Sequence, residues 1–197
     1  MAQVRETAGG ITWSATVDDL YHVPEDGKAE LVDGKLVRMS PTGFKPGRAG
    51  GRIYRRLCEY EESTRLGYAI PDNVGFIVDL PHRRSFSPDA AFYIGQPTGP
   101  GKFLEGAPIF AVEVRSERDY GPAAEKKMAA KRADYFAAGT RVVWDVDVLR
   151  AEQVRVFTAE APDEPRVHGR GSRVDAEPAV PGWSMPVDDL FKGSRRR

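Results

Sequence analysis

The chain has 197 residues, of which 41% are hydrophobic and 29% are charged, a composition typical of one globular domain with a substantial core. Lysine plus arginine and aspartate plus glutamate both number 29, so the net charge is zero and any basic binding surface must be local. The single cysteine, Cys58, excludes an internal disulfide and a cysteine-based zinc site, and is typical of a reducing compartment.

The N-terminal stretch, residues 1–15, is predicted to be a loose lead-in. It lacks the apolar core of a signal peptide, and no apolar run in the chain approaches the roughly 18 residues of a membrane span. We therefore expect a cytoplasmic protein with no membrane partner.

Turn and cap signals define the next segment. Thr16 is a typical N-cap for a short helix that ends at Tyr21. The dipeptide Asp33-Gly34 lies between two apolar runs of the segment 30–37, a pattern that predicts a two-residue hairpin turn. A Pro/Gly-rich loop is expected from Ser40 to Gly47.

A long helix is predicted from Arg48 to Leu66, because Ile53, Leu57 and Tyr60 are spaced to lie on one side. The adjoining face is basic and contains Arg48, Arg52, Arg55 and Arg56. Arg48 and Arg52 are candidates for binding the phosphates of a nucleic acid. The alternative is a solvated helix face with ordinary local ion pairs such as Arg55–Glu59.

The rest of the chain alternates between apolar runs and one further helix. Strands are expected at 74–78, 86–94, 109–116, 141–147 and 153–157, the last of them at a possible sheet edge. A helix is expected at about 121–138 and a helical turn at 187–191. Residues 159–165 are expected to form a polar turn, and residues 192–197 a disordered basic tail. This order predicts one α/β domain, residues 16–191, with a central mixed sheet between helices.

Two of these strands each contain one carboxylate within an apolar run. Asp89 follows Pro88, which favours extended backbone at the start of a strand, and Glu113 interrupts the run that begins at Ile109. Buried ionised carboxylates are costly unless they are paired, and two that are close together repel each other unless a divalent cation lies between them. The alternatives are turn hydrogen bonds for Asp89 and an arginine salt bridge for Glu113.

Lys131 is the third candidate. At 100° per residue it lies on the same helical stripe as Met128 and Tyr135, whereas Lys126 points to the opposite side. A lysine at the centre of a packing face can extend out to solvent. It can also bring an ammonium to carboxylates or phosphates on the sheet, and burial would then lower its pKa.

The sequence resembles the Uma-two-type family of restriction endonucleases, within the PD-(D/E)xK nuclease superfamily. The segments that carry the resemblance are 30–37, 40–43, 88–89, 113–116, 131–139, 143–147 and 180–183. It implies a restriction-endonuclease-like fold and Mg²⁺- or Mn²⁺-dependent hydrolysis of DNA phosphodiester bonds.

The resemblance also implies roles for individual residues. Asp89 and Glu113 would bind the metal, together with the backbone carbonyl of Val114. Arg115 stands where the superfamily usually has a lysine, and it stays protonated, so it cannot act as a base. Lys131 matches the helical lysine that is thought to substitute for it, and Glu30 matches a recurrent family glutamate that approaches the site or, alternatively, lies on the surface.

The leading hypothesis is therefore a Mg²⁺-dependent DNA endonuclease whose catalytic candidates are Asp89, Glu113, Lys131, Glu30 and Arg115. The alternative is a catalytically silent module of the same fold that binds nucleic acid or a protein partner. The sequence leaves open DNA versus RNA, the target sequence and whether the chain forms a homodimer.

Overall fold

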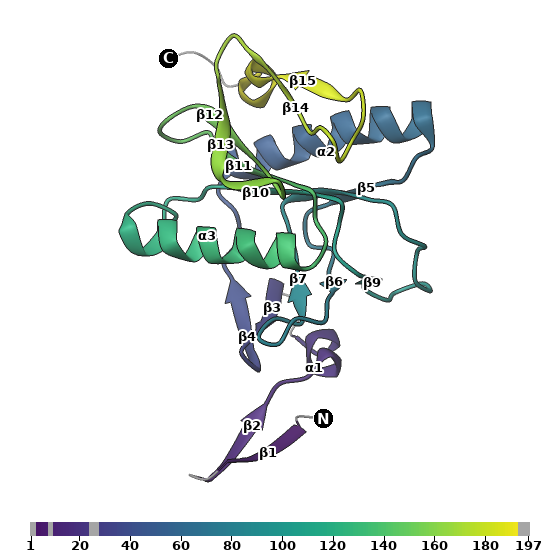
Figure 1. The fold of residues 1–197 in the computed structure, drawn as a ribbon, viewed down its shortest axis with the longest axis vertical. Helices are drawn as coiled ribbons and strands as arrows, with labels where there is room; N and C mark the ends of the chain where they lie inside the picture. Colours follow the sequence, from purple (N-terminus) through teal and green to yellow (C-terminus); the bar gives the residue numbers. More distant parts are fainter. Residues whose placement is uncertain (1–2, 8–9, 24–27, 193–197) are drawn as a thin grey trace.

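The computed structural model describes residues 3–7, 10–23 and 28–192, and its centre is a six-stranded mixed sheet in the order β13-β12-β11-β10-β8-β5. The strands are β5 (Tyr68–Pro71), β8 (Ala90–Tyr93), β10 (Phe110–Val114), β11 (Val142–Asp147), β12 (Gln153–Thr158) and β13 (Ala161–Gly169). Within this sheet, as far as the structure describes it, only β10 and β11 are parallel, and helix α3 (Pro122–Ala137) connects them. Figure 1 shows α2 and α3 on opposite faces of this sheet. The expected mixed α/β architecture is therefore confirmed.

Helix α2 (Phe44–Thr64) covers one face of the sheet. Its buried residues Ile53, Leu57 and Tyr60 have the predicted spacing, and the helix packs against β5, β8 and β10. The helix begins four residues earlier than predicted, because Pro46 lies in the first turn, where backbone N–H groups have no partner within the helix. It ends at Thr64, two residues earlier than predicted, with Arg65 in the left-handed conformation.

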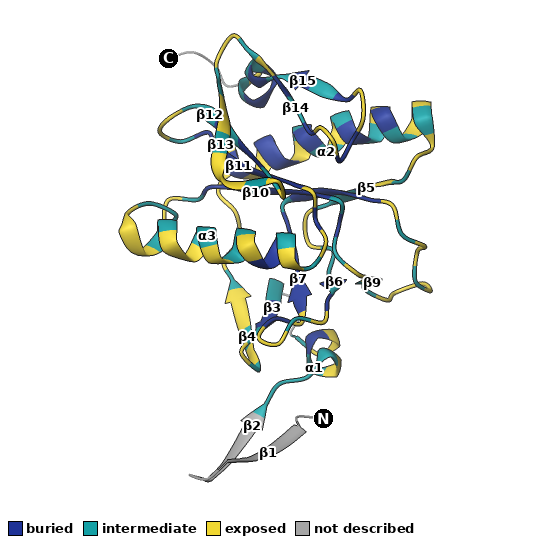
Figure 2. Cartoon of the chain, viewed as in Figure 1, coloured by how far each residue is buried: buried dark blue, intermediate teal, exposed yellow. Residues whose placement is uncertain are grey.

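Strand β10 separates two apolar clusters. Val112 packs with the residues beneath α2, whereas Ala111 packs with Tyr135 of α3. Since successive side chains of a strand point to opposite faces, Glu113 and Arg115 lie on the α3 face. Figure 2 shows the inner strands of the sheet as a buried layer between the two helices, whereas the edge strand β13 is largely exposed.

A second layer of short elements covers the α3 face. The hairpin of β3 (Lys28–Val32) and β4 (Lys35–Met39) turns at Asp33 and Gly34, which both have positive φ as predicted for this dipeptide. Beside it lie α1 (Val17–Tyr21) and a three-stranded sheet of β6 (Phe76–Ile77), β7 (Ser85–Phe86) and β9 (Leu104–Glu105). The backbone N–H of Leu31 donates to Ser85 Oγ at 2.8 Å, which attaches β3 to β7.

Several sequence predictions need correction. The polar turn expected at 159–165 is shorter, because β13 starts at Ala161 and includes Pro162 and Pro165, which edge strands tolerate. Strand β12 is consequently internal rather than at an edge. The lead-in contains a hairpin of β1 (Gln3–Thr7) and β2 (Gly10–Ser14). The predicted disordered tail lies, apart from Lys192, outside the described residues.

The chain closes on the α2 side with β14 (Arg173–Asp175), β15 (Ser184–Pro186) and the 3₁₀ turn Val187–Phe191. Trp183, just before β15, packs against Phe110 and Trp144 of the main sheet. Among the described helices, none has the length and apolar character that crossing a membrane requires.

Candidate active site

Asp89 and Glu113 lie side by side on adjacent strands, as the sequence predicts. Asp89 directly precedes β8, and its backbone N–H donates to Val112 O at 2.9 Å. Its carboxylate accepts the N–H of Val114 at 2.7 Å, so these two bonds bracket Glu113 on β10. Burial, and next the charge of Glu113, raise the pKa of Asp89 to about 6. The two carboxylates therefore share one local electrostatic environment.

Glu113 accepts hydrogen bonds from two side chains of α3. The ammonium of Lys131 is 2.8 Å from Glu113 Oε1, and the hydroxyl of Tyr135 donates to the same oxygen at 2.7 Å. Burial, followed by the charges of Glu113 and Glu30, raises the pKa of Tyr135 well above its usual value, so its hydroxyl stays a donor. The predicted stripe of Lys131 and Tyr135 on the packing face of the helix is confirmed.

Glu30 belongs to the same cluster and is buried, so the alternative of a surface residue is wrong. Its carboxylate lies 2.9 Å from Lys131 Nζ and 2.6 Å from a guanidinium nitrogen of Arg83, and it accepts the backbone N–H of Ser87 at 3.1 Å. Burial opposes its charge, but Lys131 and Arg83 outweigh burial and hold the pKa of Glu30 below its usual value. Lys131 thus connects the two glutamates.

The protonation of Lys131 differs from the expectation drawn from burial. Burial does disfavour the ammonium, but the charges of Glu113 and Glu30 and the hydrogen bonds to them outweigh it and raise the pKa of Lys131 above its usual value. The expected lowering of this pKa is therefore wrong for the arrangement observed. Lys131 is a protonated counter-ion here, and a protonated lysine can donate hydrogen bonds but cannot accept a proton from water.

Lys28 is a site residue that the sequence reasoning missed. Its ammonium lies 2.5 Å from Asp72 and 3.6 Å from Asp89, and its side chain is only 17% exposed. Lys28 and Glu30 are two apart on β3, so strand alternation could have shown that they share a side. Asp89 therefore has a lysine neighbour from β3, as Glu113 has one from α3.

A second missed group fixes the position of α3. Arg83 bonds both Glu30 and Asp134, the latter at 2.7 Å, and His82 Nε2 lies 2.7 Å from the other oxygen of Asp134. Both Arg83 and Asp134 are buried. Because Asp134 follows Lys131 by one helical turn, this network attaches the hairpin and α3 to the same loop.

Arg115 faces α3, as strand alternation predicts, but its partners are not the candidate metal ligands Asp89 and Glu113. Its guanidinium donates to Asp145 of β11 at 2.7 and 2.9 Å and to Glu125 of α3 at 2.5 and 2.9 Å. Burial disfavours its charge, but the hydrogen bonds to Glu125 and Asp145 outweigh burial and raise the pKa of Arg115. This geometry indicates a structural clamp between the start of α3 and the sheet.

Replacing Arg115 by Met is therefore expected to lower the free energy of unfolding by about 3 kcal/mol, because it leaves Asp145 with a buried charge and only Arg155 as partner. Metal affinity of the folded variant should remain that of the wild type. Denaturant unfolding and calorimetric metal titration measure the two effects. Arg118→Met, at an exposed position, is the matched control. If Arg115→Met is as stable as the wild type but does not bind metal, Arg115 contributes to the metal site and is not a structural residue.

The raised pKa of Asp89 predicts a pH-dependent effect of Asp89→Asn in metal-free buffer. The unfolded carboxyl titrates near 3.8 and the folded one near 6, so wild-type stability from this group is fully present below pH 3.8 and lost as pH rises through 6. At pH 8 the variant should be more stable by roughly 2–3 kcal/mol. At pH 3.5 the two proteins should be equal. If the wild type and Asp89→Asn have the same unfolding temperature at pH 8 as well as at pH 3.5, the raised pKa of Asp89 is contradicted.

Helix α2 approaches the site from the other face. A Cβ built on Gly50 would lie 3.3 Å from the backbone oxygen of Asp89, so the absence of a side chain permits this close contact. Of the two basic candidates on α2, Arg52 donates to the backbone oxygen of Asp189 at 2.9 Å and so already has a hydrogen-bond partner within the protein. Arg48 is exposed, and its guanidinium lies over the ring of Phe44.

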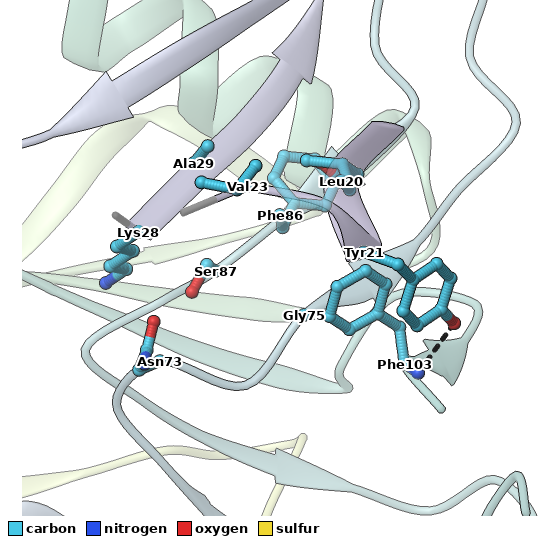
Figure 3. A pocket seen from close by; sticks show the side chains of 11 residues that line it. Leu20, Tyr21, Val23, Lys28, Ala29, Asn73, Gly75, Phe86, Ser87 and Phe103 are labelled. Atoms are coloured by element: carbon cyan, nitrogen blue, oxygen red, sulfur yellow. Dashed lines mark hydrogen bonds between the residues drawn. The ribbon is translucent and has the colours of Figure 1, made fainter. Parts of the chain in front are cut away.

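A pocket of about 270 Å³ borders the acid cluster through Lys28 and Ser87. Figure 3 shows Lys28, Ser87 and Asn73 at one end of the pocket and the stacked rings of Tyr21 and Phe103 at the other. One end is therefore polar and adjoins Asp89, whereas the other is aromatic.

The donor set fits a hard cation that keeps part of its hydration shell. Asp89 and Glu113 supply carboxylate oxygens, and the backbone of Val114 lies against Asp89. No group of three or more His, Cys, Asp or Glu side chains arranged to hold a metal occurs within the described residues. Mg²⁺ characteristically binds one or two carboxylates plus water and substrate phosphate rather than an all-protein cage.

The sequence and the fold each match known proteins. The family model of Uma2, described as "Putative restriction endonuclease", matches residues 15–188. A crystal structure of "a putative nuclease belonging to DUF820" from Anabaena variabilis superposes with a TM-score of 0.69 at 19% identity, covering 89% of this chain and 97% of that one. No functionally curated protein matches the sequence. Since the family match spans most of the chain, the protein belongs to the Uma2 family of restriction-endonuclease-like nucleases.

Proposed function

We propose that the protein is a Mg²⁺- or Mn²⁺-dependent endonuclease that hydrolyses DNA phosphodiester bonds. The observation that carries this proposal is the pair Asp89 and Glu113, two carboxylates held together against their mutual repulsion at the ends of adjacent strands. Two carboxylates that repel each other become favourable neighbours when a bound cation offsets their charge. The nuclease family and fold support a phosphodiester as the substrate.

Asp89, Glu113 and the carbonyl of Val114 would hold the metal. When bound, a divalent cation lowers the pKa of a coordinated water and neutralises charge on the phosphodiester. The hydrogen bond from the Val114 N–H fixes the Asp89 carboxylate, and Tyr135 fixes that of Glu113. Both ligands are therefore oriented before a metal arrives, which reduces the reorganisation that binding requires.

Lys131 contributes positive charge beside Glu113. Its raised pKa makes it a hydrogen-bond donor to developing negative charge on the phosphate rather than a base. Lys28 supplies a second cation on the Asp89 side. The two lysines therefore flank the carboxylate pair from β3 and α3.

The test is a cleavage assay on supercoiled plasmid and on single-stranded DNA, with Mg²⁺, Mn²⁺ or EDTA. We expect nicked or linear products in either metal and none in EDTA, and Asp89→Asn should abolish them. A matched RNA substrate distinguishes DNA from RNA hydrolysis. Cleavage that persists in EDTA, or in Asp89→Asn, would contradict the proposal.

One observation favours the alternative of a catalytically silent binding module. Lys131 and Tyr135 already neutralise and bond Glu113, so a metal must compete with an internal cation. A silent module predicts binding of nucleic acid without metal affinity and without products in the same assay. Calorimetric titration of Mg²⁺ and Mn²⁺ separates the two functions.

A further inference from the structure

The first turn of α2 presents an aromatic ring to solvent. The side chain of Phe44 is 73% exposed, the largest exposure among the large apolar side chains that the structure describes. Exposing a phenyl ring forfeits the stabilisation that burial would give it. Single exposed apolar side chains are common on proteins, so the case for a ligand at Phe44 depends on what surrounds the ring.

The surroundings of this ring are cationic. The guanidinium carbon of Arg48, one helical turn further on, lies 5.6 Å from the ring centroid of Phe44, and the neighbouring Lys45 is exposed. The other arginines of this helix face have carboxylate or carbonyl partners: Arg52 and Arg56 bond Asp189, and Arg55 bonds Glu59. An aromatic ring with cations beside it is the arrangement by which proteins stack bases of single-stranded nucleic acid.

The ring is also close to the candidate metal site along the helix. Gly50, on the same helix, contacts the backbone of Asp89. Six residues separate Phe44 from Gly50, which corresponds to about 9 Å along the axis and to a rotation of about 240°, so the exposed ring and the buried glycine lie on different sides of the helix. A strand whose phosphate lies at Asp89 and Glu113 could therefore bring a base next to that phosphate to Phe44.

We propose that Phe44 and Arg48 form a stacking platform for an unpaired nucleobase that flanks the phosphate bound at the carboxylate pair. The inference rests on the proposed nuclease function and adds to it a preference for single-stranded or locally opened substrates. A duplex covers the faces of its bases by stacking, so the ring can use its π-face only where a base is free.

Fluorescence anisotropy of a labelled oligonucleotide, single-stranded or in a duplex, tests the platform in EDTA, where no cleavage is expected. Phe44→Ala should weaken single-strand binding roughly 5- to 150-fold and leave the slope of affinity against salt unchanged. Arg48→Gln should reduce that slope. Phe44→Trp should retain the affinity. Leu66→Ala removes an apolar side chain that is 59% exposed just beyond the other end of α2 and is the matched control.

The outcomes separate this inference from the proposed function. If the wild type binds and cleaves DNA but Phe44→Ala binds single strands equally well, the platform is refuted and the nuclease stands. If the wild type neither binds nor cleaves any nucleic acid, the proposed function fails and the platform fails with it. Sedimentation velocity detects the competing role: if Phe44→Ala changes only self-association, the ring is a contact between copies of the chain and the inference is overturned.

Discussion

Replacing Glu113 by Gln is expected to abolish divalent-metal binding while the protein still folds. An amide supplies one neutral oxygen, whereas the proposed site depends on two anionic carboxylates to hold Mg²⁺ or Mn²⁺. Calorimetric titration of both metals measures the loss. Glu117→Gln, at an exposed position four residues further along the chain, is the matched control and should bind metal like the wild type.

The stability of the same variant provides a second readout. Removing the charge relieves the repulsion with Asp89, so the sequence alone predicts that stability holds or rises. The structure reverses this sign, because Glu113 accepts bonds from both Lys131 and Tyr135. Tyr135 and Lys131 both contact Oε1, and Lys131 also donates to Oε2 at 2.9 Å. A glutamine side chain offers one acceptor oxygen, so its NH₂ group would face at least one of these donors, at a cost of about 1–3 kcal/mol. Unchanged metal affinity in Glu113→Gln would refute the metal assignment whatever the stability.

The sequence identified the two carboxylates as candidates because Asp89 directly precedes an apolar strand and Glu113 interrupts one, and a lone charge in such a run is informative by itself. Lys131 was predictable for a similar reason, since helical periodicity identifies a charge on a packing face. The mixed sheet and both long helices followed from the same local patterns. Where local patterns misled, at the start of α2 and at β13, the cause was proline in positions that need no backbone donor.

The remaining site residues depend on contacts between distant segments. Arg83 bonds Glu30 and Asp134, which are 53 and 51 residues away in sequence, and no periodicity within one segment reveals such partners. Arg115 illustrates the same limit, because alternation fixed its face correctly but could not identify Asp145, 30 residues away, as its partner. The protonation state of a side chain also depends on its charged neighbours. Burial alone therefore gave the wrong direction for the pKa of Lys131, which Glu113 and Glu30 raise.

Replacing Lys131 by Ala is expected to reduce cleavage at least about 100-fold, the scale for loss of one preorganised donor to developing negative charge. Metal affinity should remain or increase, because the competing ammonium no longer occupies the space between Glu30 and Glu113. The metal-free variant should lose roughly 3 kcal/mol of stability, since the buried Glu30 and the half-buried Glu113 lose a shared cation. Bound metal should return part of it, which thermal unfolding with and without Mn²⁺ measures.

Companion variants distinguish charge from shape at this position. Lys131→Met keeps most of the side-chain volume without the charge and should be as inactive as Lys131→Ala. Lys131→Arg keeps the charge but should rescue little, because the ammonium is enclosed at 2.8 and 2.9 Å by two carboxylates and a guanidinium is larger and planar. Lys126→Ala, on the exposed side of the same helix, should cleave like the wild type. If Lys131→Ala retains full activity while Arg115→Ala is inactive and still folded, the cation that acts on the phosphate comes from β10 and its extension rather than from α3.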